Sequence, residues 1–304
     1  MLASGEMKDL PAAESVLSDA PIAPQGGHSP RLVPPHTPLH GMLLWFITLL
    51  GIVLTSAAVG AGAVVWGGSV DALRQTSWVL TSTVITQGVV GGITAAWLLR
   101  WQIPRGVALP LRIPTPSGWV GGILVTLGLA PLATAIALYV QRWAPAEFSA
   151  LEMARRLATA QGATWVVVLL CVCLLPAIVE EALFRGVLTE AFARHSVWLG
   201  ALVPSLLFGI FHFDLAQSAG TAVLGLGFAA ARLYTGSMLA PAVAHGLNNL
   251  LALLSTRYAS DPMAPVPITT VLGALVLALV GLALLRRDAK RRQTSQVTGQ
   301  ACKS

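Results

Sequence analysis

The chain has 304 residues, of which 55% are hydrophobic and only 11% are charged, and its mean hydropathy is +0.73. Soluble globular proteins carry about 25% charged residues, so this sequence lacks the polar surface that such a protein exposes to water. A net charge of +6 would suit nucleic-acid binding, but the basic residues gather beside apolar runs, where they set topology and face anionic lipid. We therefore expect an integral membrane protein whose partners include membrane lipid and no nucleic acid.

Eight apolar runs follow an N-terminal stretch that holds seven prolines in its first forty residues. Each run approaches the roughly 20 residues that cross a bilayer as a helix. Backbone polar groups find no water in hydrocarbon, so such spans are helical, and none of the nine tryptophans lies in the middle of a run. The sequence predicts an all-α, polytopic membrane helix bundle with about eight transmembrane helices. The predicted spans are 42–66, 77–99, 118–140, 164–184, 197–213, 219–235, 238–256 and 266–285.

Lysine and arginine residues indicate the orientation. Three arginines lie in the loop after the second run, and an even number of spans places both termini on the same, cytoplasmic, side. Arg142, Arg155 and Arg156 fall on the opposite side and are partly offset by Glu147 and Glu152. We expect a multi-pass protein, in the cytoplasmic membrane if its source is bacterial. The basic residues that follow the last run are Arg286, Arg287, Lys290, Arg291 and Arg292.

Few ionisable side chains remain within the predicted spans, and they cluster in the second half of the chain. An unpaired charge at the bilayer centre costs roughly 2.5–3.5 kcal/mol, so each needs a partner or a function. Glu181 and Arg185 are four residues apart in the order that favours an ion pair on one helix face. Glu180 lies about 100° further round the helix, and Pro176 loosens the turn before it. A carboxylate without a cation of its own suits general acid–base catalysis.

Two histidine motifs lie on the following helices. Phe208 and His212 share one face, and His245 and Asn249 share another, so that the latter two side chains can direct donors at one spot. Alone, His212 would fit an interfacial histidine, and the second motif would fit hydrogen bonding between helices. Together with Glu180 they supply a carboxylate, an imidazole and a donor pair, which is what activation of water and stabilisation of an oxyanion require.

At these residues the sequence resembles the CPBP family of intramembrane proteases. The family includes the type II CAAX prenyl endopeptidases (the Ras-converting enzymes) and bacterial relatives of the Abi type, some of them tied to bacteriocin self-immunity. Its motifs are Glu-Glu-x-x-x-Arg, Phe-x-x-x-His and His-x-x-x-Asn on successive membrane helices, and this chain has all three in that order within 164–256. The resemblance implies a CAAX-type intramembrane endopeptidase with its active site within the bilayer.

The resemblance also implies roles for the motif residues. Glu180 and His212 would activate the attacking water, and His245 and Asn249 would form the oxyanion hole. The supporting pair would be Glu181 and Arg185.

No metal or other cofactor is predicted, because Glu180 can itself act as the base. Zinc stays open as an alternative, with Glu180, His212 and His245 as ligands and water in the fourth position, since the family has been described both as metalloproteases and as metal-independent glutamate proteases. The expected substrate is a peptide or protein, prenylated or unprenylated.

Two other classes of function remain open. A non-catalytic membrane partner, such as a bacteriocin-immunity or secretion scaffold, would normally lose a motif residue, and none is lost. A proton-coupled transporter would use the same charges as a relay, but the motif-bearing half shows no inverted repeat. The segments we expect are a disordered Pro-rich tail (1–40), scaffold helices (41–145), a CPBP-like catalytic core (160–260), a final transmembrane helix (264–286) and a basic cytoplasmic tail (287–304).

Overall fold

The computed structural model describes residues 37–144, 150–261 and 263–301. The predicted tail at 1–40 lies outside the described residues except for its last four. Every regular element in the described ranges is helical, which confirms the all-α prediction. Helices occupy all eight predicted positions: α2 (Pro38–Gly67), α3 (Thr76–Arg100), α5 (Pro116–Trp143), a continuous helix (Gly162–Ala193), α10 (Val197–Ile210), α11 (Leu215–Thr235), α12 (Leu239–Tyr258) and α13 (Ile268–Ala301). Three short helices connect them: η2 (Val70–Arg74), α4 (Arg105–Ala108) and α6 (Ala150–Ala158).

Five of these helices are long and apolar enough to cross a bilayer: α2, α3, α5, Gly162–Ala193 and the Ile268–Thr294 part of α13. The protein is therefore an integral membrane protein. Helix α10 is apolar but has only 14 residues. Helices α11 and α12 have 21 and 20 residues but are less apolar, as expected for helices that pack mainly against other helices. How many of the eight cross the bilayer completely stays a prediction.

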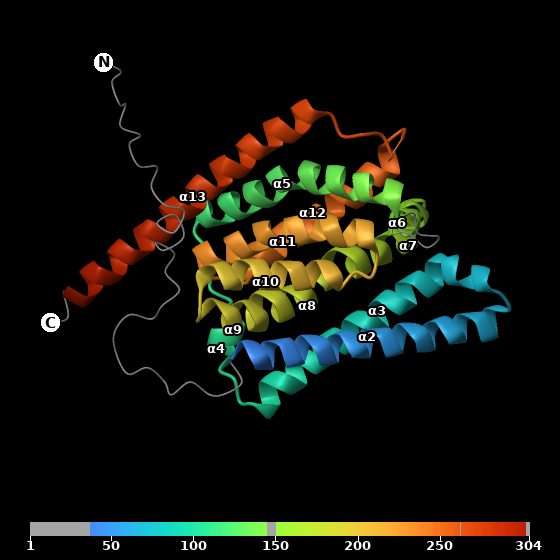
Figure 1. Ribbon diagram of the computed structural model, residues 1–304, viewed down its shortest axis with the longest axis horizontal. Coiled ribbons are helices and arrows are strands. Elements are labelled where there is room, and N and C mark those ends of the chain that lie inside the picture. The colour runs from blue at the N-terminus through green and yellow to red at the C-terminus, as the bar shows by residue number, and fades with distance from the viewer. Residues whose placement is uncertain (1–36, 145–149, 262, 302–304) are drawn as a thin grey trace, which may run out of the picture.

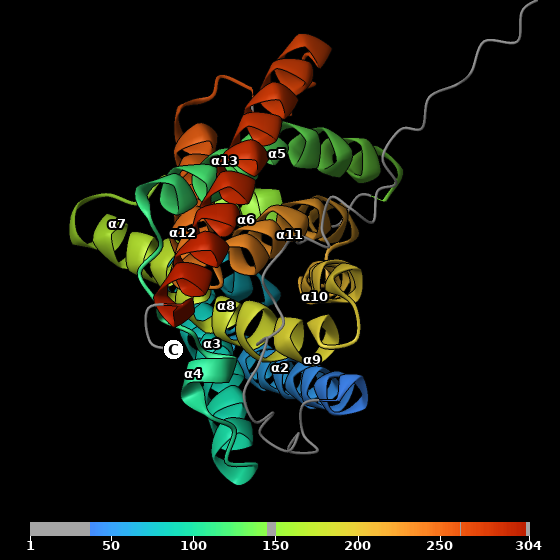
Figure 2. The same cartoon turned by 90° about the vertical axis from the view of Figure 1, so that its left-hand side faces the viewer.

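The helices run alternately in opposite directions and form layers (Figure 1). Helices α5 and α13 make one side of the bundle and the α2–α3 hairpin makes the other, as the turned view in Figure 2 also shows. Between them lie α10, α11 and α12 and the long helix that contains the Glu-Glu motif. That long helix contacts α2, α3, α10, α11 and α12. The motif helix is therefore enclosed by other helices, which is the environment that buried ionisable groups need.

Helices α5 and α13 approach closely through small residues. A Cβ atom placed on Gly128 would lie 2.6 Å from the carbonyl oxygen of Ala274, and one on Gly281 would lie 2.6 Å from the amide nitrogen of Val125. Close backbone approach through glycine is the usual way in which membrane helices gain packing energy. The pairing of α5 with α13 thus depends on residues that have no side chain.

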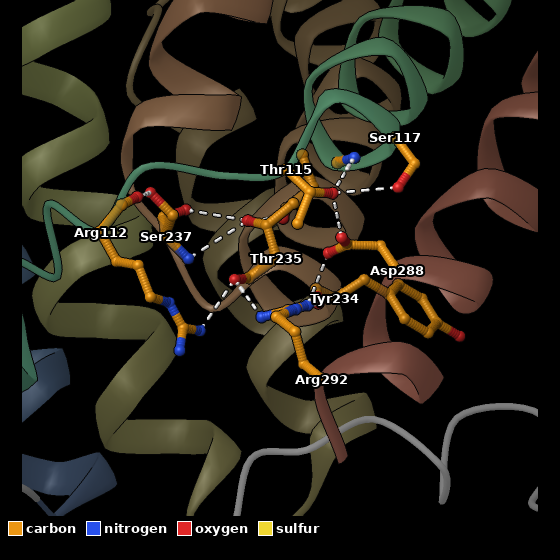
Figure 3. Close-up of polar contacts among 10 residues, drawn as sticks. Arg112, Thr115, Ser117, Tyr234, Thr235, Ser237, Asp288 and Arg292 are labelled. Carbon is orange, nitrogen blue, oxygen red and sulfur yellow. Dashed lines mark hydrogen bonds and ion pairs between the residues drawn. The ribbon is translucent and has the colours of Figure 1, made fainter. Parts of the chain in front are cut away.

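Polar contacts fix the end of α13 to the rest of the bundle (Figure 3). Asp288 accepts a hydrogen bond from the Thr115 hydroxyl at the start of α5 and forms an ion pair of 2.8 Å with Arg292. Arg292 and Arg112 both donate to the carbonyl oxygen of Thr235, at 2.5 and 2.9 Å. The predicted final transmembrane helix (264–286) ends at 286, but α13 continues as a helix because these contacts hold its next turns against α5 and α11.

Candidate active site

The long helix that carries the Glu-Glu motif has irregular hydrogen bonding on both sides of it. A π-helical turn, η3, precedes α8, and a second one, η4, follows it. Pro176 at the start of α8 has no N–H to offer the carbonyl of Val172 one turn earlier. π-Helical turns are frequent at functional sites, and here they surround both glutamates. The segments are α7 (Gly162–Val168), η3 (Leu169–Leu174), α8 (Leu175–Glu181), η4 (Ala182–Leu188) and α9 (Thr189–Ala193).

Glu181 is fully buried and has two charged or ionisable partners. Its Oε1 atom lies 3.2 Å from Nη1 of Arg185 and 3.0 Å from Nδ1 of His245. Arg185 is also fully buried, and its Nη2 atom donates to the carbonyl of Gly225 at 3.0 Å. The ion pair predicted between Glu181 and Arg185 is therefore present, and it also anchors a histidine that the sequence did not connect with it.

Aromatic rings enclose the Arg185 guanidinium. Its central carbon lies 5.8, 4.7 and 5.0 Å from the ring centroids of Phe184, Phe208 and Phe228. Rings at this distance attract a cation through their electron-rich faces, and more strongly when water is excluded. The Phe-x-x-x-His motif thus contributes Phe208 to the support of the Glu181–Arg185 pair.

Glu180 has a different environment although it is the next residue. It is 6% exposed, so it faces neither lipid nor bulk water. Its Oε1 atom accepts a hydrogen bond of 2.6 Å from Nε2 of Gln87 on α3, and its Oε2 atom lies 3.9 Å from Nε2 of His245. That second separation is longer than a hydrogen bond. One carboxylate oxygen is therefore held by a neutral donor, and the other has no partner within hydrogen-bond distance among the described residues.

His245 links the two glutamates. Its side chain is almost completely buried, with Nδ1 at Glu181 and Nε2 towards Glu180. The imidazole stacks on Phe228, with centroids 4.7 Å apart and planes at 17°, and meets the edge of Phe208 at 5.6 Å. Because an ionised carboxylate can only accept, the Nδ1 of His245 donates to Glu181. Its Nε2 atom is then the atom that faces the site.

His212 lies in the turn between α10 and α11. With 14 residues, α10 rises only about 21 Å, less than the roughly 30 Å of a bilayer core, so α10 is too short to cross the core along the membrane normal. The Nδ1 atom of His212 lies 2.9 Å from the carbonyl of Phe208. A carbonyl only accepts, so Nδ1 carries the proton and Nε2 keeps its lone pair in the neutral ring. Phe213, with a φ of 55°, turns the chain immediately afterwards.

The structure brings His212 near the glutamate cluster without a direct bond to it. Its ring meets Phe208 at 5.0 Å, on the same aromatic residue that His245 contacts. Glu180 and His245 are close enough for their charges to act on it. No hydrogen bond or ion pair between Glu180 and His212 occurs in the described structure. A water molecule between them is compatible with this arrangement, since catalytic contacts are often loose before substrate binds.

Asn249 has a partner that the sequence did not indicate. Its Nδ2 atom donates to the carbonyl of Val172 at 3.2 Å, and its Oδ1 atom lies 3.5 Å from Nδ2 of Asn248. Val172 is the residue whose carbonyl cannot receive a helical bond from Pro176. His245 and Asn249, predicted to direct donors at one spot, are thus held by different groups, Glu181 and Val172.

Gln87 was not predicted as a site residue, because it lies in a helix that was predicted to be a scaffold without ionisable groups. A signal was present, because Gln87 is an amide in the middle of an apolar run. Such a side chain needs a partner in hydrocarbon. Only its partner, Glu180 in another helix, was invisible from the sequence.

The residues as they lie do not fit a metal ion. Within residues 37–144, 150–261 and 263–301, no group of three or more His, Cys, Asp or Glu side chains is arranged to hold one. Of the alternative zinc ligands, Glu180 gives one oxygen to Gln87, and its other oxygen is 3.9 Å from His245.

Comparison with known proteins identifies the family of the chain. The family model described as type II CAAX prenyl endopeptidase, Rce1-like, matches residues 162–251, which contain both glutamates, both histidines and the asparagine. The chain belongs to the Rce1-like family. Membership implies a CAAX-type intramembrane protease. The matched region begins at the first residue of the helix that carries the glutamates and ends in α12.

A curated relative of this Rce1-like protein is an Escherichia coli protein described as an uncharacterized 24.3 kDa protein. The two are 32% identical over 162 residues, which cover 51% of this chain and 70% of the relative. No solved structure gives a significant match.

Proposed function

We propose that this Rce1-like protein is an intramembrane endopeptidase in which Glu180 acts as general base on water. The observation that carries the proposal is the unequal partnering of two adjacent carboxylates. Glu181 is committed to Arg185 and His245, whereas Glu180 has one oxygen on the neutral amide of Gln87 and one without a close partner. Among the described residues each glutamate keeps its Oε2 atom without a hydrogen-bond partner, so the countercharge distinguishes them. Glu181 is fully buried beside the Arg185 guanidinium, whereas Glu180 is held by a neutral amide and its charge stays available to accept a proton.

The proposed first step uses one water molecule between Glu180 and His212. The water oxygen attacks the carbonyl carbon of the scissile peptide while one of its protons passes to Glu180. The second O–H of the water donates a hydrogen bond to Nε2 of His212 and keeps its hydrogen. Nε2 can accept because the ring proton is on Nδ1, which donates to the Phe208 carbonyl. The peptide carbonyl becomes a tetrahedral carbon that carries an oxyanion.

His245 and Asn249 are the proposed donors to that oxyanion. Glu181 holds Nδ1 of His245, so Nε2 faces the site, and an N–H at that atom donates to the oxyanion. Asn249 can contribute its second amide hydrogen while the first stays on Val172. Collapse of the intermediate breaks the C–N bond, and Glu180 returns its proton to the leaving amine.

The proposed substrate is a membrane-associated peptide or protein segment of the CAAX type. Whether recognition requires a prenyl group is a separate question that substrates can answer. Purified protein in lipid nanodiscs is incubated with matched peptides that differ only in prenylation, and the products are identified by mass spectrometry. We expect one new C-terminus per cleaved peptide, loss of cleavage in Glu180→Ala and His212→Ala, and retained cleavage by a variant changed outside the site, Lys290→Ala.

The alternatives predict other results in the same assay. A non-catalytic partner or a proton-coupled transporter cleaves none of the peptides. The wild-type protein and the Glu180→Ala variant would then give the same result, with no cleavage product. Cleavage that persists in both Glu180→Ala and His212→Ala would show that another site or a contaminant is responsible.

A further inference from the structure

Gln87 lies outside the region that matches the Rce1-like family, yet it makes the shortest polar contact of the candidate base. It belongs to α3, which packs beside α8. The Gln87 side chain is 7% exposed, and its Nε2 atom lies 2.6 Å from Oε1 of Glu180. Helix α3 therefore contributes a polar group to the site and is more than a scaffold.

The orientation of this amide follows from the chemistry of its partner. An ionised carboxylate has only acceptors, so Gln87 must turn its NH₂ group towards Glu180. Its Oε1 atom is buried and has no hydrogen-bond partner within the described part of the chain. A buried acceptor without a partner costs free energy. Apart from the hydrogen bond to Glu180, burial of this amide is therefore unfavourable. The contact with Glu180 is what accounts for a glutamine at this depth.

A neutral donor suits a base better than a cation would. Hydrogen bonds to a charged group are short and directional, so the amide limits rotation of the carboxylate. An Arg or Lys at the same place would also neutralise the charge, as Arg185 does for Glu181, and would make Glu180 a weaker base. With its Oε1 atom held, Glu180 presents Oε2 on the side of His245.

We propose that Gln87 is a positioning residue, which holds one oxygen of Glu180 so that the other is directed at the attacking water. This inference rests on the proposed function, in which Glu180 is the base. Helix α3 would then contribute to catalysis by orienting Glu180, without contact with the reacting atoms.

The test compares Gln87→Met with Thr94→Val in nanodiscs. Methionine keeps the length and apolar volume of glutamine and removes the donor. Thr94 is a matched control on the same helix, because it is buried and its hydroxyl donates only to the carbonyl of Val90 in that helix. We expect Gln87→Met to lower kcat on the order of 10- to 100-fold, the size of a lost hydrogen bond to a charged group, with KM unchanged. We expect Thr94→Val to keep the wild-type kcat.

A second measurement separates this inference from the proposed function. Melting temperatures are measured for Gln87→Met, Glu180→Met and the double variant. If the two side chains interact, Gln87→Met lowers the melting temperature in the wild-type background and no longer does so beside Glu180→Met. If the two substitutions are coupled in melting temperature but the wild-type protein cleaves no peptide, the contact between Gln87 and Glu180 is supported and the proposed function is overturned. Full kcat in Gln87→Met, or a melting temperature that falls equally in both backgrounds, would overturn the positioning role.

Discussion

Glu180 and Glu181 are adjacent in the sequence but point in different directions from their helix, and we assign them different roles. Glu181 points into a cage of Arg185, His245 and phenylalanine rings, where both its charge and its geometry are fixed. Glu180 points towards α3 and meets an amide. A turn of about 100° between neighbours is enough to place one carboxylate in the support of the site and the other in its chemistry.

Exchange of each glutamate for glutamine is expected to separate these tasks. Glu181→Gln leaves the fully buried Arg185 without its countercharge, and breaking a buried pair in this way costs about 3–5 kcal/mol. Glu180→Gln removes the base but leaves no cation unpaired. We expect Glu181→Gln to melt at a clearly lower temperature in detergent, and Glu180→Gln to melt like wild type while cleaving no peptide. Equal melting temperatures for the two variants would contradict this assignment.

Metal dependence is decided at the same residues. The metal-free mechanism needs only Glu180 as base, whereas a zinc site would use Glu180 as a ligand and need Glu181 as base, against its ion pair with Arg185. We expect peptide cleavage to survive exhaustive chelation, with bound metal measured by mass spectrometry before and after treatment. Inactivation by chelator followed by recovery with one equivalent of zinc would require a metalloprotease mechanism and leave the protease assignment unchanged.

At the scale of the elements, the helix before the glutamates is linked to α12 at a carbonyl that lacks its usual helical hydrogen bond. Pro176 offers no N–H to the Val172 carbonyl, and the Asn249 side chain donates to that carbonyl instead. Asn249 therefore combines a structural contact with its proposed role at the oxyanion. The two contributions can be separated, because the structural one depends on Pro176 and the catalytic one does not.

We expect Asn249→Ala to slow cleavage about 10²- to 10³-fold, as for the loss of one oxyanion donor, and to lower the melting temperature. Pro176→Ala in the same background restores an N–H near Val172. It should recover melting temperature while leaving the rate low. Recovery of the rate would mean that Asn249 acts only as a link between helices.

Glycine contacts between α5 and α13 give a second prediction at this scale. A larger side chain at Gly128 meets the backbone of α13 at Ala274 and Ala278, so the helices must separate. Gly273 on α13 has open space around its Cβ position and serves as the control. We expect Gly128→Leu to destabilise the folded protein by about 1–3 kcal/mol or more, measured by thermal unfolding in detergent. Gly273→Leu should have no such effect, and equal effects would show that this helix pair is not closely packed.

The sequence was informative about elements and less so about contacts between them. Apolar run lengths placed eight helices, and the spacing of Glu181 and Arg185 identified their ion pair, because both follow from periodicity within one helix. The hydrogen bonds from Gln87 to Glu180 and from Asn249 to Val172 join residues 93 and 77 positions apart. Such pairs depend on which helices become neighbours. The π-helical turns beside the glutamates likewise arise from packing, since Pro176 alone indicates only that the helix is perturbed.

At the scale of the whole molecule, the direction of the helices bears on orientation. The first residues of α2 and the last turns of α13 lie at the same end of the bundle (Figure 1). That end carries the basic residues after 285 and also Arg112, which donates a hydrogen bond to the carbonyl of Thr235 at the end of α11. At the other end, Arg156 forms an ion pair of 2.9 Å with Glu152. The positive-inside tendency counts basic residues near the ends of spans, and it favours the α13 end as cytoplasmic.

Cysteine labelling tests this orientation directly. Single cysteines are introduced at Lys290, Ser69 and Ser260, all of which are exposed, in a background with Cys302→Ser; the remaining Cys171 and Cys173 are buried. Lys290 lies at the α13 end, whereas Ser69 and Ser260 lie in the connections after α2 and α12 at the other end. With a membrane-impermeant maleimide we expect Lys290→Cys to react only in inside-out bacterial vesicles, and Ser69→Cys and Ser260→Cys only in right-side-out ones. The reversed pattern would invert the protein in the membrane. Reaction of Ser69→Cys and Lys290→Cys from the same side would mean that at least one of the helices from α3 to α13 does not cross the bilayer.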